Sequence, residues 1–429
     1  MRVAVVGAGI SGIQTALLLE AGGCEVTVFE ARDRIGGRLH TVSDSRGGLF
    51  EAGGEWIDAD QPLVRALVEK YQNRLDEAVR EPALAMFQGE VRRTDDLWPD
   101  LLADEETVEH MARSMARELT IPAWTNTKFA KYDSLTLASF IRQHCGSDRG
   151  HWWMTANLRS DEGDDLLHIG LLGWLTGYVH YVDRENLNRG ESEMSAFRAP
   201  MGFSQLLECM VRDLKGDVIL NAPLKKVEHN QSSVTLHFES ISETFDAVVL
   251  TLPPPCLERV VFEPAVTGAK RCAIEACGMS RAIKIVWEFD SAWWKERGFC
   301  GRLHCDGSLQ QLWDGALGDN PVLTAYICGH RAVEWTELAD PVGAGVYELT
   351  QYFPEAKEHF LKGQIFDWIN DPYSLGAFSH YAPGYTLGHA ENMVRSEVRI
   401  HFAGEHTATW TGFIEGALES AHRVVGEIC

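Results

Sequence analysis

The chain begins with a short run of apolar residues, mostly β-branched, that ends in glycines. Residues 3–6 read Val-Ala-Val-Val, and residues 11–20 then carry apolar side chains at helical spacing on one face. A second apolar run follows at residues 26–29. A strand, a glycine turn, a helix and a second strand in this order predict a βαβ unit, which requires a parallel sheet and a right-handed crossover.

The pattern changes character further along the chain. From about residue 76 to 198 the apolar positions follow helical spacing among many charges and tryptophans, which predicts a helical region. Strand-like runs return after it, at residues 218–220, 233–238, 245–252, 283–289 and 399–404. The third of these runs stops at consecutive prolines, which cannot continue the interior of a sheet. The last one leads into a predicted helix from residue 412 to about 427.

These elements predict an α/β fold made of two interleaved domains. We expect a Rossmann-like domain from residues 1–75, 199–273 and 371–429, and an α+β substrate-binding domain from residues 76–198 and 274–370. Both ends of the chain then meet in one parallel sheet. Repeats and linker-like tracts are absent from the sequence, which suits interleaved domains better than a string of separate ones.

A GxGxxG motif lies between the first strand and the first helix. Gly7 permits the turn, Gly9 lets a pyrophosphate approach the backbone, and Gly12 packs the helix on the strand. The helix opens at Ser11 and directs its N-terminus toward the phosphates. Glu30, at the end of the second strand, is placed to accept hydrogen bonds from a ribose diol. The motif therefore predicts a dinucleotide site.

Two further features favour FAD over a nicotinamide cofactor. Arg32 and Arg38 flank a second glycine turn at Gly37, which resembles the second motif of glutathione-reductase-like flavoproteins. Glu405 follows the last strand and is a partner for ribityl hydroxyls, while the helix after Gly412 directs its positive end at the flavin. The residues predicted to contact FAD are Gly7, Gly9, Ser11, Gly12, Glu30, Arg32, Gly37, Arg38, Gly54, Glu55, Leu224, Gly404, Glu405, Phe413 and Ile414.

The composition of the chain limits its expected partners and its expected location. The formal net charge of -23 repels nucleic acid and anionic membranes and favours a cationic ligand. No stretch approaches the roughly 20 apolar residues that a membrane span needs, and the first residues leave no room for a signal peptide. The 10 cysteines are scattered singly and the 16 histidines show no HExxH spacing. We expect a cytoplasmic protein without a metal, a nucleic acid partner or a membrane.

Five ordered segments resemble the flavin monoamine and polyamine oxidases. They are residues 34–38, 50–57, 282–286, 373–378 and 402–417. The resemblance implies hydride transfer from the α-carbon of a small-molecule amine to flavin N5, followed by hydrolysis of the imine to an aldehyde or ketone. It also implies reoxidation of the flavin by O2, which yields H2O2.

The same resemblance implies roles for individual residues. Lys284 corresponds to the lysine that holds a water near flavin N5 and assists the oxygen chemistry, and burial favours proton transfer by a lysine. Phe378 and Phe413 correspond to two aromatic rings that enclose the amine. Trp56 and Asp58 fall in the substrate site, where an acid is able to pair with a distal ammonium.

Ala377 stands where monoamine oxidases carry the cysteine that attaches to the flavin, so the FAD is expected to be bound non-covalently. An L-amino-acid oxidase is an alternative, but it needs an arginine for the substrate carboxylate. Glu55 and Trp56 occupy the place of that arginine, and Arg198 or another arginine would have to replace it. A flavin-binding protein without turnover is a second alternative, which the retained Lys284 disfavours. The amine and the oligomeric state, including a homodimer, stay open.

Overall fold

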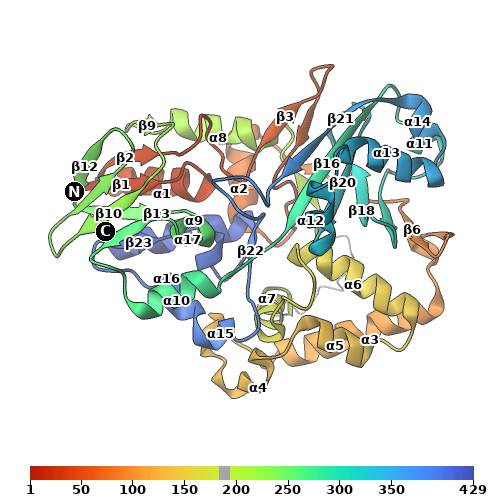
Figure 1. Cartoon of the computed structure of the whole chain (residues 1–429), viewed down its shortest axis with the longest axis horizontal. Coiled ribbons are helices and arrows are strands. Elements are labelled where there is room, and N and C mark those ends of the chain that lie inside the picture. Colours follow the sequence, from red (N-terminus) through yellow and green to blue (C-terminus); the bar gives the residue numbers. More distant parts are fainter. Residues whose placement is uncertain (183–193) are drawn as a thin grey trace.

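The computed structural model describes residues 1–182 and 194–429. Its first layer is a five-stranded parallel sheet in the order β23-β13-β1-β2-β9. The strands are β1 (Arg2–Val6), β2 (Glu25–Phe29), β9 (Val218–Ile219), β13 (Ala247–Leu250) and β23 (Ile400–Phe402). Helices α1 (Ile10–Ala21) and α17 (Ile414–Ile428) lie side by side on it. Figure 1 shows both chain ends beside this sheet, as the sequence predicted.

The βαβ unit forms because its apolar side chains are buried on both faces of the sheet. Val3 and Val5 pack against Ile13 and Leu19 of α1, and all four are fully buried. Ala4 and Val6 face the opposite side, where they join the core beneath a four-stranded sheet. That sheet has the order β12-β11-β10-β14 and consists of β10 (Lys226–His229), β11 (Val234–His237), β12 (Ser242–Phe245) and β14 (Val261–Glu263).

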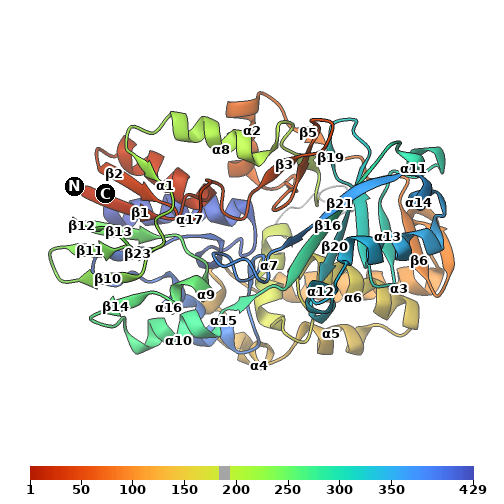
Figure 2. The same cartoon turned by 45° about the horizontal axis from the view of Figure 1, so that its top comes forward.

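A seven-stranded sheet forms the other half of the molecule, in the order β21-β16-β20-β18-β17-β6-β7 (Figure 2). Its strands are β6 (Leu84–Phe87), β7 (Glu90–Arg93), β16 (Ala282–Phe289), β17 (Leu303–Cys305), β18 (Gln311–Asp314), β20 (Val322–Cys328) and β21 (Phe360–Asp367). Every residue of β16 is buried. A helical layer lies against this sheet and comprises α3 (Pro99–Ala116), α5 (Leu137–His144), α6 (Asp148–Glu162) and α7 (Leu171–Val182).

The remaining elements connect or cover these layers. The helices are α2 (Pro62–Gln72), α4 (Ala130–Asp133), α8 (Gly202–Arg212), α9 (Pro254–Leu257), α10 (Gly268–Ala276), α11 (Trp293–Glu296), α12 (His330–Thr336), α13 (Pro341–Tyr352), α14 (Glu355–His359), α15 (Tyr385–Gly388) and α16 (Ala390–Val394). The short strands are β3 (Thr41–Ser43), β4 (Leu49–Glu51), β5 (Asp76–Glu77), β8 (Phe197–Arg198), β15 (Gly278–Met279), β19 (Ala316–Leu317) and β22 (Ser379–His380). Among the described residues, no helix combines the length and the apolar character needed to cross a membrane.

Three details differ from the sequence-based expectations. The segment 76–198 is not wholly helical, because it contributes a hairpin of β6 and β7 that turns at Gln88 and Gly89, both with positive φ. The run 245–252 is divided at Asp246 between β12 and β13, which belong to different sheets. The last helix begins at Ile414, since Gly412 has φ +87 and lies outside it.

Candidate active site

A cavity of about 510 Å³ opens at the carboxyl edge of the parallel sheet. Residues at the carboxyl ends of the strands line it: Gly7 directly after β1, Glu30 directly after β2, Thr251 directly after β13, and Glu405 three residues after the end of β23. Ligands of open α/β sheets bind at this edge because the strand ends and helix N-termini converge there. All the residues predicted to contact FAD line the cavity except Gly12, which packs behind the turn.

The three glycines of the turn differ in what surrounds them. A Cβ built on Gly12 would lie 1.9 Å from the carbonyl oxygen of Gly7, so this glycine is required for packing. Gly7 has φ +108, a conformation that disfavours any side chain. A Cβ on Gly9 would have its nearest neighbour, the oxygen of Gly36, at 3.9 Å. Gly9 therefore leaves open space on the cavity side, and this is where a pyrophosphate fits against the backbone.

Glu30 is held in place by two backbone donors. Its carboxylate accepts hydrogen bonds from the N–H of Ala8 at 2.8 Å and of Arg32 at 2.9 Å. The side chain is buried and lines the cavity, while its role as a partner of a ribose stays a prediction. Arg32 is in turn fixed by Asp371 and by the hydroxyl of Ser374 at 2.8 Å. The hydroxyl of Ser11 bonds to Ser420 at 3.0 Å, which joins α1 to α17.

Glu405 orders the second glycine turn and the start of α17. It accepts hydrogen bonds from Arg38 at 2.7 Å, from the Ser379 hydroxyl at 2.6 Å and from the Gly412 N–H at 2.8 Å. Burial alone would raise the pKa of Glu405, but Arg38, His406 and the Ser379 hydroxyl together outweigh it and the pKa lies below its ordinary value. Glu405 is therefore an anion that positions Arg38 beside the cavity. Ile414, the first residue of α17, lines the same cavity, so the positive end of the helix faces it.

Lys284 lies in the middle of β16 with its ammonium group fully hydrogen-bonded. Nζ donates to the carbonyl oxygens of Glu51 at 3.1 Å and Gly53 at 2.9 Å, and to Oε2 of Glu55 at 2.8 Å. The side chain is 5% exposed and lines the cavity. The structure thus brings Lys284 to the predicted site, paired there with a carboxylate that is 229 residues away in the sequence.

Glu55 connects Lys284 to two aromatic residues. Its carboxylate accepts a hydrogen bond from Nε1 of Trp313 at 3.1 Å and lies 3.4 Å from Nε of Arg198. The guanidinium of Arg198 stacks over the ring of Trp56 at 4.2 Å. Glu55 and Trp56, both predicted for the site, line the cavity. No local pattern in the sequence indicates that Glu55 pairs with two cations.

Phe378 and Phe413 reach the cavity from two different segments. The backbone of Phe378 pairs with Ser280, which donates its N–H at 2.7 Å and accepts at its hydroxyl at 3.0 Å. Phe413 precedes α17, and its ring meets Trp410 edge to face at 5.7 Å. Both rings are half-buried and face the same space as Lys284.

Asp58 is buried and engaged with the protein. Its Oδ1 accepts a hydrogen bond from the N–H of Ser195 at 2.6 Å, and its Oδ2 from the amide of Gln61 at 3.2 Å. It lines the cavity, but these contacts also give it a structural role. Pairing of Asp58 with a distal ammonium stays a prediction.

A second cavity of about 250 Å³ adjoins the first and was not foreseen. Both cavities are lined by Ser160, Asp161 and Glu162 at the end of α6, and by Phe413. Trp174, Tyr178 and Trp410 add aromatic walls to the second one. The segment that supplies α3, α6 and α7 carries no family motif, so the sequence did not single out these lining residues.

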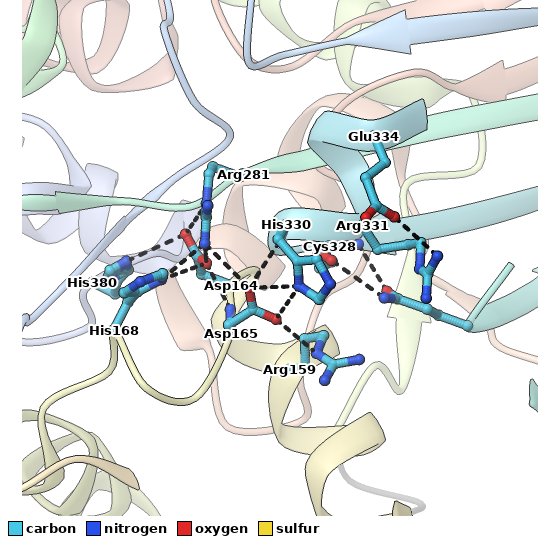
Figure 3. Close-up of polar contacts among 11 residues, drawn as sticks. Arg159, Asp164, Asp165, His168, Arg281, Cys328, His330, Arg331, Glu334 and His380 are labelled. Carbon is cyan, nitrogen blue, oxygen red and sulfur yellow. Dashed lines mark hydrogen bonds and ion pairs between the residues drawn. The ribbon is translucent and has the colours of Figure 1, made fainter. Parts of the chain in front are cut away.

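An ion-pair network fixes the loop after α6 (Figure 3). Arg281 donates to both oxygens of Asp164, with Nε at 3.0 and 3.2 Å, and its Nη2 lies 2.8 Å from Nδ1 of His168. Asp164, Asp165 and His168 have the spacing of metal ligands, but the guanidinium of Arg281 already occupies the space beside them. We therefore interpret the cluster as structural.

Arg198 is not available for a substrate carboxylate. Its Nη1 and Nη2 donate to the carbonyl oxygens of Ala316 at 2.8 Å and Asp314 at 2.7 Å. With its third nitrogen near Glu55, the guanidinium is committed to the protein. This arrangement removes Arg198 from the arginines that could serve the amino-acid oxidase alternative.

A dinucleotide site at the carboxyl edge of a parallel sheet, next to an aromatic-lined cavity with a buried lysine, is typical of FAD-dependent oxidoreductases. The chain belongs to the family of flavin containing amine oxidoreductases, whose sequence model matches residues 10–429. It is thus an oxidoreductase that acts on CH–NH groups. Its cofactor is FAD.

Several relatives are similar over nearly the whole chain. The flavin-containing amine oxidase B of Homo sapiens is 25% identical, with 99% of this chain and 85% of that protein covered. The corresponding A form of Bos taurus is 23% identical, with 99% and 84% covered. A putrescine oxidase bound to putrescine superimposes with a TM-score of 0.88 at 22% identity, with 100% and 99% covered. Cyclohexylamine oxidase from Brevibacterium oxydans IH-35A superimposes with a TM-score of 0.84 at 23% identity, with 100% of this chain and 99% of that chain covered. The fold is shared with these structures.

Ala377 leads to a prediction about the mode of FAD binding. Its backbone is fixed, because its N–H donates to Ser280 at 2.9 Å and its carbonyl accepts from Arg38 at 3.1 Å. Acid precipitation of the wild type is expected to release the flavin, while Ala377→Cys is expected to retain most of it with the precipitate. An alanine-to-cysteine variant was made in a redesign of cofactor binding in putrescine oxidase. The control is Ala377→Ser, which has no thiol; equal release from both variants would contradict the assignment of this position to the flavin.

Proposed function

We propose that the protein is an FAD-dependent oxidase of small-molecule amines that uses O2 as electron acceptor. The observation that carries the proposal is the convergence of Lys284, Phe378 and Phe413 on the cavity that also holds the dinucleotide residues. These three side chains come from three separate segments, and all of them line the same cavity. The putrescine-bound relative supports an amine as substrate.

Bound FAD would accept a hydride from the α-carbon of the amine at N5 and return the electrons to O2 as H2O2. Phe378 and Phe413 present two apolar faces to the amine, which exclude water and thereby favour the uncharged form of the reacting nitrogen. The Lys284 ammonium donates its three hydrogens to Glu51, Gly53 and Glu55, so it would orient a water at the inner wall of the cavity by exchanging one of these acceptors for the water. Hydrolysis of the released imine then gives an aldehyde or ketone.

We also propose the boundaries of the two domains. We assign residues 1–75, 199–273 and 371–429 to the FAD-binding domain, and 76–198 and 274–370 to the substrate-binding domain. The five-stranded sheet draws only on the first set and the seven-stranded sheet only on the second. A cytoplasmic location and the oligomeric state stay predictions.

The test is anaerobic mixing of the holoprotein with monoamines, diamines and L-amino acids while flavin absorbance is followed. Amines are expected to bleach the flavin, and readmission of O2 is expected to restore the colour with about one H2O2 per turnover, as the stoichiometry of two-electron transfer requires. Bleaching by L-amino acids alone would favour the amino-acid oxidase alternative. No bleaching by any compound would favour a flavin-binding protein without turnover.

A further inference from the structure

The end of α6 carries a carboxylate that the proposed chemistry does not use. Glu162 is the last residue of α6 and lines both cavities. Within residues 1–182 and 194–429 its carboxyl group has neither a hydrogen bond nor an ion pair. Burial, with the charge of Asp161 beside it, raises the pKa of Glu162 to about 8. A carboxylate in this state gains from a cationic partner, and none of residues 1–182 and 194–429 supplies one.

The residue that follows Glu162 lies against one ring of the aromatic pair. A Cβ built on this residue, Gly163, would lie 2.6 Å from Cζ of Phe378, so the backbone directly after α6 abuts the edge of that ring. The contact is fixed from both sides, because Ser280 holds Phe378 and Arg281 holds Asp164. Figure 3 shows Arg281 and Asp164 meeting at the loop that follows α6. The position of Glu162 relative to the amine site is therefore set by the fold.

The charge of the second cavity favours a cation. Its described lining has four carboxyl groups, Glu105, Glu109, Asp161 and Glu162, against two guanidinium groups, Arg80 and Arg302. Three imidazoles also line it, and burial favours the neutral form of each: it lowers the pKa of His304 to about 3, that of His380 to about 4, and that of His180 below its ordinary value.

Two of the other acidic side chains have partners within the protein. Glu109 pairs with Arg113, and Glu105 accepts from Nε1 of Trp153 at 2.7 Å. Glu162 is thus the cavity carboxyl group for which the described residues provide no compensation.

We propose that Glu162 binds the second ammonium group of an aliphatic diamine whose first nitrogen lies between Phe378 and Phe413. The inference rests on the proposed amine oxidase function and names its substrate class. One nitrogen, uncharged, faces the flavin between two apolar rings, while the other stays protonated against Glu162. Asp58 is the less suitable partner, because both its oxygens are engaged by Ser195 and Gln61.

The test compares diamines with n-alkylamines of equal chain length, from three to six carbons, by stopped-flow reduction of the wild-type and Glu162→Gln holoenzymes. For the preferred length, Glu162→Gln is expected to raise the apparent dissociation constant of the diamine roughly 10- to 100-fold, the range of a charge-assisted hydrogen bond. The limiting reduction rate and the constants for the n-alkylamine are expected to stay unchanged. Glu109→Gln is the matched control, since Arg113 already pairs with it, and is expected to alter neither constant.

Two results would overturn the proposal. One is a wild-type enzyme that binds no diamine more tightly than its matched n-alkylamine. The other is a Glu162→Gln enzyme that loses affinity for both ligands equally. Failure of the amine oxidase function is distinguishable, because it abolishes bleaching but not binding. Calorimetric titration of the anaerobic holoenzyme with the same ligand pairs then decides the role of Glu162 by the same criterion.

Discussion

Replacement of Gly9 by alanine is expected to weaken FAD binding roughly 30-fold, about 2 kcal/mol, while the apoprotein stays as stable as the wild type. The reason is that an added Cβ meets only the oxygen of Gly36, at 3.9 Å, and otherwise projects into the space reserved for the pyrophosphate. Gly9 has φ −73, which suits an L-residue. The measurements are FAD titration of the apoprotein, followed by fluorescence, and thermal unfolding with and without FAD.

Gly12→Ala is the matched control within the same turn. Its Cβ would lie 1.9 Å from the oxygen of Gly7, so the backbone must move and the apoprotein itself is expected to lose about 1–3 kcal/mol of stability. Equal destabilisation of both apoproteins would contradict the assignment of Gly9 to the cofactor. A Gly9→Ala protein with unchanged FAD affinity would place the pyrophosphate elsewhere.

Lys284→Met is expected to slow reoxidation of the reduced enzyme by O2 about 100-fold, within the range for a positioned proton donor or its water. Anaerobic reduction by the amine is expected to change little, because Lys284 lies on the wall of the cavity and the substrate is held by the aromatic rings. Stopped-flow mixing with O2 measures the first rate, and anaerobic mixing with the amine measures the second. Unchanged reoxidation would refute the role of Lys284.

Loss of Lys284 also leaves Glu55 short of a buried partner, which costs about 3–5 kcal/mol when one member of such a pair is removed. The double variant Lys284→Met/Glu55→Gln removes this charge, so it is expected to recover stability but not reoxidation. Glu55→Gln alone separates the two effects, since it keeps the lysine. If that single variant slows reoxidation as much as Lys284→Met, the pair rather than the lysine carries the effect.

The parts of the fold with local patterns could be predicted from the sequence. The βαβ unit follows from apolar runs and a glycine turn, and Lys284 followed from the motif around it. The hairpin of β6 and β7 was missed because its first strand, Leu84–Phe87, has no β-branched residue. The split at Asp246 was missed because two consecutive strands of different sheets form one continuous pattern.

The parts of the site that could not be predicted from the sequence depend on contacts between distant segments. Glu55 meets Lys284 across 229 residues and Arg198 from yet another segment, and no local pattern encodes such a meeting. Glu162 follows an exposed acid at the end of a helix and therefore resembles an ordinary solvated residue in the sequence. Only the fold shows that this helix end faces two cavities.

The order of strands in the parallel sheet has a consequence for how the protein is made. β1 pairs with β2, which follows shortly, but its other neighbour β13 begins about 240 residues later. At roughly 5–20 residues per second, the ribosome needs about 10–50 s to synthesise the chain between them. β23, which carries Glu405 behind it, emerges later still. During translation the edge of β1 that later pairs with β13 therefore stays unpaired for this time. The cofactor pocket is complete only after the last strand, β23, has been synthesised.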